Sequence, residues 1–180
     1  MEFCREKLAT IIERMGFGAK AEARIREDGH ILLEIVGGED LGLLIGKEGN
    51  TLRALQTILR VLVVKRFDKK AMLILDADNY LLKREEALID TAYAAVERVE
   101  KTLRKVQLKP MNSVERRIIH MTLANEENVH TYSVGEGADR RVVIAPGKVR
   151  SQESFRDTGD YAPEAADDSY AYSSESHGNR

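Results

Sequence analysis

The chain has 180 residues, 43% of them hydrophobic and 32% charged, which leaves room for one sizeable domain or two small ones. A single cysteine, Cys4, excludes a disulfide framework, and no apolar run approaches the roughly 18 residues of a membrane span, so we expect a cytoplasmic protein that is not embedded in a membrane. The net charge of -2 gives no general attraction to nucleic acid, and Cys4 with four scattered histidines provides no zinc-binding spacing.

Residues 1–79 show the periodicities of three helices and three strands. Asp28-Gly29, between two strand-like segments, is a strong hairpin signal. Asn50 or Thr51 is expected to cap the longer of the two central helices. The expected elements are a helix at 2–15, strands at 19–28 and 30–38, helices at 39–45 and 50–67, and a strand at 69–78.

The sequence "GLLIGKEGNTLRALQ" joins the two central helices through a glycine-containing loop. A Walker phosphate loop would need glycine where Leu41 stands and serine or threonine where Glu48 stands. A dinucleotide-binding fingerprint would need glycine in place of Leu44 and a strand directly before the loop. The loop therefore does not indicate a nucleotide cofactor.

The same loop suits the backbone of a polynucleotide. Gly46 and Gly49 permit close approach of another chain, the amides at the start of the next helix face an anion, and Lys47 adds a positive charge. In this order of elements, "LLIGKEGNTLRALQ" resembles a type II KH domain, a resemblance that covers residues 1–79. It implies a loop that clamps about four nucleotides.

Two residues near the loop leave its role open. Glu48 places a carboxylate beside the expected phosphate path, which favours weak RNA binding or use of the surface for a protein contact. Arg53 lies about one helical turn past the loop and belongs either to the binding surface or to an ordinary solvated face. The loop could also be a simple turn between helices. The RNA-binding residues expected here are Gly46, Lys47, Glu48, Gly49 and Arg53.

Beyond residue 79 a second pattern of helices and strands begins. Asn112 and Glu115 have the spacing of a capping box. Val114, Ile118 and Met121 are expected to turn the capped helix toward a core. The expected elements are a helix at 79–104, a short strand at 106–110, a helix at 112–124, and strands at 129–134 and 140–146 joined by a glycine-containing hairpin.

The capped helix carries a second candidate RNA-binding site. Arg116 and His120 are separated by four residues and share one helix face, with Arg117 at its flank, and the later hairpin adds Arg140 and Arg141. Guanidinium and neutral imidazole groups suit phosphate and sugar contacts, and both stack on unpaired bases. The alternatives are a histidine satisfied by a neighbour and ordinary surface arginines.

The context "PMNSVERRIIHMTL…EGADRRVVIAP" resembles the small domain named for its Arg-xxx-His motif. That family binds single-stranded nucleic acid, and the resemblance covers about residues 80–146. A catalytic alternative would use Asp76 and Asp78 at the end of a strand, but no third metal ligand is recognisable, and strand-end aspartates usually form turns. We expect no enzyme activity and no cofactor.

A KH domain followed by an Arg-xxx-His domain resembles the bacterial SpoIIIJ-associated Jag/KhpB family, although the extra N-terminal domain of many members is not seen here. The resemblance implies a cytoplasmic single-stranded RNA-binding protein, an RNA chaperone or post-transcriptional regulator linked to cell shape and envelope homeostasis. It also implies a small single-KH-domain partner, while binding of single-stranded DNA and a homodimer stay open. The alternative is a protein-interaction adaptor whose KH surface no longer binds RNA.

The expected fold class is α+β, with two small domains that each pack a three-stranded sheet on helices. We expect a KH domain at 1–79, a connecting helix with the Arg-xxx-His domain at 80–146, and a disordered acidic tail at 147–180. Residues 151–180 carry two basic and seven acidic side chains, against 26 and 23 in residues 1–150. A tail this polar cannot bury enough apolar surface to offset the conformational entropy that it would lose on ordering.

Overall fold

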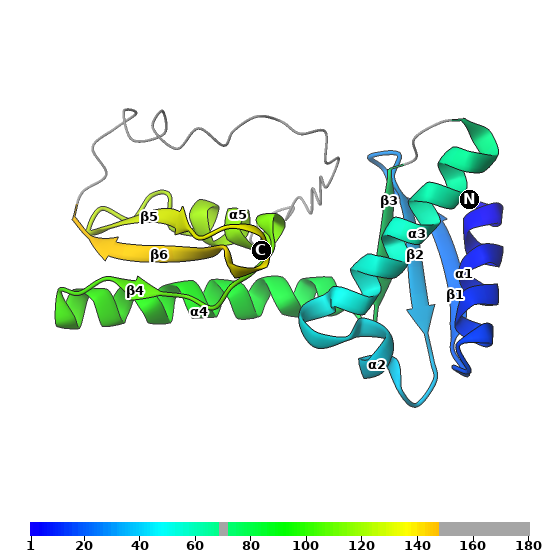
Figure 1. The fold of residues 1–180 in the computed structure, drawn as a ribbon, viewed down its shortest axis with the longest axis horizontal. Coiled ribbons are helices and arrows are strands. Elements are labelled where there is room, and N and C mark those ends of the chain that lie inside the picture. Colours follow the sequence, from blue (N-terminus) through cyan, green and yellow to red (C-terminus); the bar gives the residue numbers. More distant parts are fainter. Residues whose placement is uncertain (69–71, 148–180) are drawn as a thin grey trace, which may run out of the picture. The chain divides into compact units, whose positions relative to one another are not determined.

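The computed structural model describes residues 1–68 and 72–147, which form two compact units divided after Arg84. Each unit has a three-stranded sheet with helices packed on it (Figure 1), as the α+β prediction required. The predicted acidic tail lies outside the described residues except for Gly147, and so does the predicted start of the third strand at 69–71. None of the helices in the described ranges is long and apolar enough to cross a membrane.

In the first unit, three helices contribute buried residues to one core with a mixed sheet (Figure 1). β1 and β2 are antiparallel, β2 and β3 are parallel, and β2 is the central strand. The predicted Asp28-Gly29 hairpin is confirmed, because the Asp28 side chain accepts a hydrogen bond from the His30 amide at 3.0 Å. The elements are α1 (Glu2–Arg14), β1 (Lys20–Ile25), β2 (Ile31–Val36), α2 (Leu41–Ile45), a 3-10 turn (Lys47–Gly49), α3 (Asn50–Phe67) and β3 (Leu73–Ala77).

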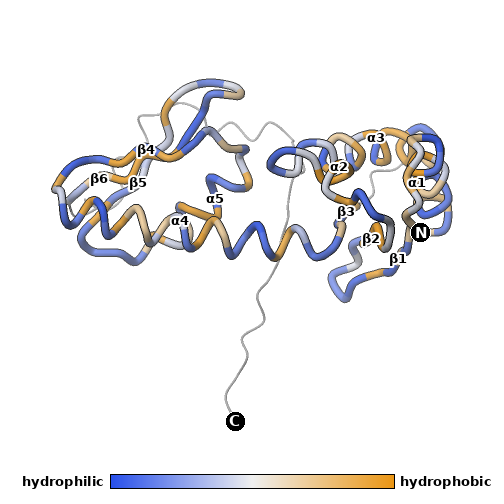
Figure 2. Tube along the Cα trace, turned by 90° about the horizontal axis from the view of Figure 1, so that it is seen from below, coloured by the Kyte–Doolittle hydropathy of each residue, from blue (hydrophilic) through white to orange (hydrophobic). Residues whose placement is uncertain are grey.

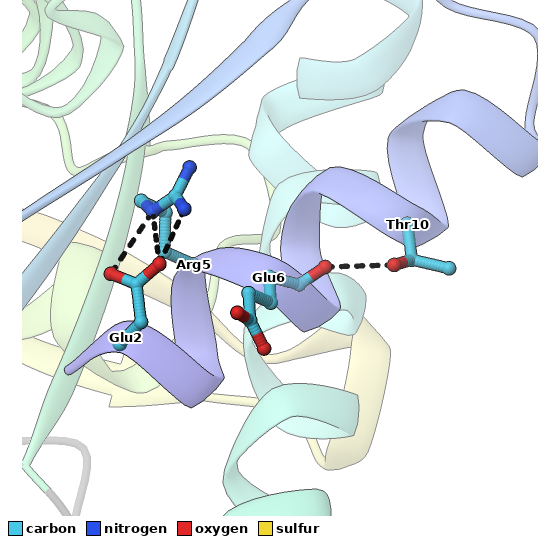
Figure 3. Close-up of polar contacts among 4 residues, drawn as sticks. All are labelled: Glu2, Arg5, Glu6 and Thr10. Atoms are coloured by element: carbon cyan, nitrogen blue, oxygen red, sulfur yellow. Dashed lines mark hydrogen bonds and ion pairs between the residues drawn. The ribbon is translucent and has the colours of Figure 1, made fainter.

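The helix α1 is amphipathic and closes the core at one side. Its buried residues are Cys4, Leu8 and Ile12, spaced one helical turn apart. On its exposed side, Arg5 pairs with Glu2 one turn earlier, and the Thr10 hydroxyl donates to the Glu6 carbonyl at 2.8 Å (Figure 3). These exposed contacts contribute little stability, so burial of the apolar stripe holds the helix on the sheet.

The second unit packs helices against an antiparallel sheet in the order β4-β6-β5. Hydrophobic positions recur along α4 between hydrophilic ones (Figure 2), and its buried residues include Leu88, Ala92 and Val99. They pack with residues of α5 and the sheet in one core. The elements are α4 (Tyr80–Thr102), which begins in the first unit, β4 (Val106–Gln107), α5 (Ser113–Thr122), β5 (Val129–Val134), a 3-10 turn (Gly137–Asp139) and β6 (Arg141–Pro146).

The start of α5 is as predicted, but its buried face is only partly as predicted. The Asn112 side chain accepts from the Glu115 amide at 3.1 Å, and the Glu115 carboxylate accepts from the Asn112 amide at 3.2 Å, which completes the capping box. Met121, predicted to face the core, is 61% exposed, whereas Glu115 and Ile119 are buried. Ile118 packs against the core as predicted. The prediction for Met121 was wrong because the core includes strands on the Ile119 side, which also brings Arg116 and His120 near β5.

The helix cap predicted after the glycine loop is also different. The N-cap of α3 is Gly49, in the left-handed conformation, and neither Asn50 nor Thr51 caps the helix. Asn50 instead accepts a hydrogen bond from Arg53. Glycine takes the left-handed conformation without a steric penalty, so the turn itself starts the helix.

Candidate nucleic-acid interface

The glycine turn between α2 and α3 has a conformation that only glycine fills easily at two positions. Gly46 and Gly49 both have φ near +72°. A Cβ atom at Gly46 would lie 2.1 Å from the Thr51 hydroxyl oxygen, and one at Gly49 would lie 2.7 Å from the Tyr80 ring. The turn therefore depends on both glycines for its own geometry, apart from any need to admit a ligand.

Part of the turn's hydrogen-bonding capacity is used internally. The Gly46 amide donates to the Gly42 carbonyl at 2.8 Å, and the Gly49 amide donates to the Gly46 carbonyl at 3.2 Å. For the amides of Lys47 and Glu48, no hydrogen bond to another element is found in the described part of the chain. These two amides are the ones open to an anion at this turn.

The charged side chains around the turn differ in exposure. Lys47 is exposed, Glu48 is half-buried with φ at +52°, and Gly49 is buried. Arg53, one helical turn further on, is half-buried and donates to the Asn50 side chain. The turn thus offers the exposed ammonium group of Lys47 and the guanidinium of Arg53, which is oriented by Asn50, with the Glu48 carboxylate between them in sequence.

A second cluster joins α5 to β5 through two hydroxyl groups. His120 Nδ1 lies 2.7 Å from Thr131 Oγ1, and His120 Nε2 lies 3.1 Å from Ser133 Oγ. Arg116 Nη1 donates to the same Ser133 oxygen at 3.3 Å. The motif's two side chains are therefore tied to one strand and to each other through a shared hydroxyl.

Burial controls the charge of this cluster. It lowers the pKa of His120, and the neighbouring Arg116 cation lowers it further, so the imidazole is neutral near pH 7. Burial also lowers the pKa of Arg116, with a second contribution from Arg140, but a guanidinium stays protonated. Among the described residues Arg116 Nε has no hydrogen-bond partner, although it is buried.

The structure divides the five candidate residues of the second unit. Arg116, His120 and Arg140 are brought together, since Arg140 is close enough to lower the pKa of Arg116. Arg117 is exposed on α5. Arg141 is paired in register with Val134 on the other face of the sheet and donates to the Asp139 carbonyl at 3.0 Å.

Three polar or aromatic contacts of these sites were missed from the sequence. Thr131 and Ser133 are two residues apart in β5, so both side chains point to the helix side of the sheet. Two hydroxyl residues at alternate positions of a predicted strand could have indicated this contact. Tyr80 lies against Gly49 although 31 positions separate them, and nothing in the sequence indicates that contact.

The strand-end aspartates have structural partners. Asp76 Oδ1 accepts from the amides of Ala77 at 2.8 Å and Leu81 at 3.2 Å, where α4 begins. Burial raises the pKa of Asp76, and these amide hydrogen bonds oppose the shift. Asp78 pairs with Lys83 at 2.8 Å. In residues 1–68 and 72–147 no group of three or more metal-binding side chains is found.

Two family models match the chain. The model of the KhpA/KhpB KH domain matches residues 5–75, and the model of the Arg-xxx-His domain matches residues 86–146.

Curated proteins named RNA-binding protein KhpB are similar to the chain. The protein of Bacillus subtilis (strain 168) is 39% identical over 140 residues, which are 77% of this chain and 66% of that protein. The Clostridium symbiosum protein is 43% identical over 108 residues, 60% of this chain and 49% of that protein. The Lactiplantibacillus plantarum protein is 39% identical over 104 residues, 58% of this chain and 32% of that protein. The matched part of the chain therefore covers less than two thirds of the length of each of these relatives.

Proposed function

Because the chain belongs to the KhpB family, with a KH domain followed by an Arg-xxx-His domain, we propose that it binds single-stranded RNA. The observation that carries this proposal is the cluster of Arg116 and Arg140 beside the neutral His120. Two guanidinium groups held close together repel each other, and the buried Arg116 Nε lacks an acceptor in the described structure. An anionic phosphate would relieve both costs.

The glycine turn supplies the second contact in this proposal. Lys47 and the amides of Lys47 and Glu48 hold a phosphate, while Arg53 approaches the neighbouring nucleotide. Each contact alone is weak. When one strand occupies both, the second contact forms at a high effective concentration, so the joint affinity exceeds that of either part.

The cellular role extends the proposal. We assign the protein to the cytoplasm as a non-enzymatic RNA chaperone or post-transcriptional regulator, linked to cell shape and envelope homeostasis. This role rests on the resemblance to the KhpB family, whose curated members are named only as RNA-binding proteins.

A protein partner is part of the same proposal. The outward side of α3 exposes three apolar residues, with exposed fractions of 48% for Ile58, 60% for Val61 and 43% for Val64. Such a patch on a small domain is typical of an interaction surface. It supports binding of a small single-KH-domain protein or a second copy of this chain.

The adaptor alternative rests on the glycine turn. Gly49 is buried, the Gly49 amide donates within the turn and the Gly46 amide donates to α2, and Glu48 adds a negative charge. These features weaken a phosphate site. If the KH domain has become a protein-binding surface, RNA binding would depend on the Arg-xxx-His domain alone or would be absent.

Ultraviolet crosslinking of the full chain to cellular RNA distinguishes the RNA-binding proposal from the adaptor alternative. We expect crosslinking by the wild type and a strong loss in Arg116→Ala/His120→Ala, with a smaller loss in Lys47→Glu. Arg98→Ala, an exposed arginine on α4, is the matched control and should crosslink like the wild type. No crosslinking by the wild type would favour the adaptor.

A further inference from the structure

The sheet of the second unit has an outer face that the Arg116 cluster does not use. Thr131 and Ser133 contact His120 on the helix side, so the alternate residues of β5 lie on the opposite face. There His130 is paired in register with Ala145, and Tyr132 with Val143. Ala145 and Val143 are buried, so the two aromatic rings, with the exposed Gln107 of β4 beside Val143, are the side chains that this part of the face presents.

The two rings stand side by side along the strand. Their centroids are 5.9 Å apart and their planes differ by 20°. Residues two apart in a strand are separated by about 6.6 Å, so each ring projects from the sheet with its faces turned along the strand. Tyr132 therefore has one ring face toward His130, and it is 37% exposed.

The surroundings of Tyr132 are neutral to basic. The three strands contain no aspartate or glutamate. Val134 is paired in register with Arg141, whose side chain is 32% exposed and oriented by the Asp139 carbonyl. Exposed lysines, Lys105 and Lys109, flank the edge strand β4. The nearest acidic group of the hairpin, Asp139, lies 3.9 Å from Arg141 Nη2 and is 87% exposed.

We propose that Tyr132, backed by His130, is a stacking platform for an unpaired base, with Arg141 contacting the adjoining phosphate. A partly exposed aromatic ring next to a cation is an arrangement that holds single-stranded nucleic acid without sequence preference. The inference rests on the proposed RNA binding and adds a contact on the sheet face opposite the Arg116 cluster. It also gives Arg141 a role separate from that of Arg116.

The test measures binding of the full chain to two fluorescein-labelled strands of equal length, an oligoadenylate and a strand of abasic ribose phosphates. Both strands carry the same phosphates, so their difference reports contacts to bases. Tyr132→Thr removes the ring but keeps a residue that favours strands, and Tyr132→Phe keeps the ring. Tyr93→Ala is the matched control, because Tyr93 is exposed on α4 of the same unit.

We expect Tyr132→Thr to bind oligoadenylate about five- to tenfold more weakly, with little change on the abasic strand. Tyr132→Phe and Tyr93→Ala should match the wild type on both strands. Equal binding of oligoadenylate by Tyr132→Thr and Tyr93→Ala would overturn the platform while leaving RNA binding intact. No binding of either strand by the wild type would overturn the proposed function and the platform together.

Discussion

The two candidate sites are built by different physical means. In the glycine turn the backbone sets the site, because φ near +72° at Gly46 and Gly49 and close contacts with Thr51 and Tyr80 admit no other residue easily. In the Arg-xxx-His domain side chains set the site, because two hydroxyls hold Arg116 and His120 in place. A substitution in the first should therefore damage folding, and one in the second should damage binding.

The largest effect is expected from Gly46→Ala. The new Cβ would collide with the Thr51 side chain in a backbone conformation, φ 72° and ψ 176°, that costs L-residues about 1–3 kcal/mol, and overpacking adds about 1–3 kcal/mol. We expect the free energy of unfolding to fall by about 3 kcal/mol, measured by urea denaturation.

Gly42→Ala is the matched control for that change. Gly42 lies in α2, has no positive φ, and has open space at the Cβ position. The control should leave stability unchanged or raise it by about 0.5–1 kcal/mol. If Gly46→Ala is as stable as Gly42→Ala, the claim that the backbone defines this turn is wrong. Because substitution of Gly46 strains the backbone, Lys47→Glu is a better probe of phosphate binding than a change at Gly46.

The next largest effect is expected on RNA affinity from Arg116→Ala. Hydrogen bonds to charged groups contribute about 1.5–3 kcal/mol, which corresponds to at least a tenfold loss of affinity. Its side chain is only partly buried, so the fold should persist. Fluorescence anisotropy with labelled single-stranded RNA gives the affinity, and circular dichroism checks the fold. Unchanged affinity in a folded Arg116→Ala protein would remove this residue from the site.

A smaller effect concerns pH and stability. The folded-state pKa of His120 is lowered by burial and by Arg116, so the unfolded chain binds the proton more readily. The contribution of neutral His120 should be fully present above the ordinary histidine pKa of about 6.5 and should be lost as pH falls through the lowered value. A titration of the His120 ring followed by NMR checks this directly. A midpoint above 6.5 would contradict the buried, neutral assignment.

The smallest effect is expected from Lys47→Ala on the salt dependence of binding. Removal of one phosphate contact on a single strand should reduce the slope of log affinity against log salt by about 0.7. The loss of affinity should be smaller than that in Arg116→Ala. Anisotropy titrations across a salt series measure the slope, and a slope equal to that of the wild type would separate Lys47 from the phosphate path.

Local signals predicted most of the fold. Periodicity, the Asp28-Gly29 hairpin and the Asn112–Glu115 capping box act between residues close in sequence, and the structure confirms them. The buried face of α5 was predicted only in part, because Ile118 packs on the core, but Met121 is apolar and exposed while Glu115 is buried. Which face of a helix is buried depends on the strands that pack against it. Glu115 was recognised as a capping-box residue, but its burial was not predicted.

The two candidate sites could be predicted from the sequence as motifs, but the contacts within them could not. The motif positions of Arg116 and His120 followed from their spacing, yet their shared partner Ser133 is 13 residues beyond His120. The same holds for Tyr80 and Gly49. Because side chains alternate between the two faces of an extended chain, the adjacent residues Arg140 and Arg141 lie on different faces of the sheet. The strand register shows that Arg141 is the one on the outer face.

The most direct measurement is the affinity of the full chain for a long unstructured RNA in a double-mutant cycle of Lys47→Glu and Arg116→Ala/His120→Ala. If one strand contacts both domains, each variant binds more weakly than Arg98→Ala, and the combined variant binds more weakly than either. Equal affinity of the wild type, both variants and Arg98→Ala for the RNA would contradict the proposed binding of one strand by both domains.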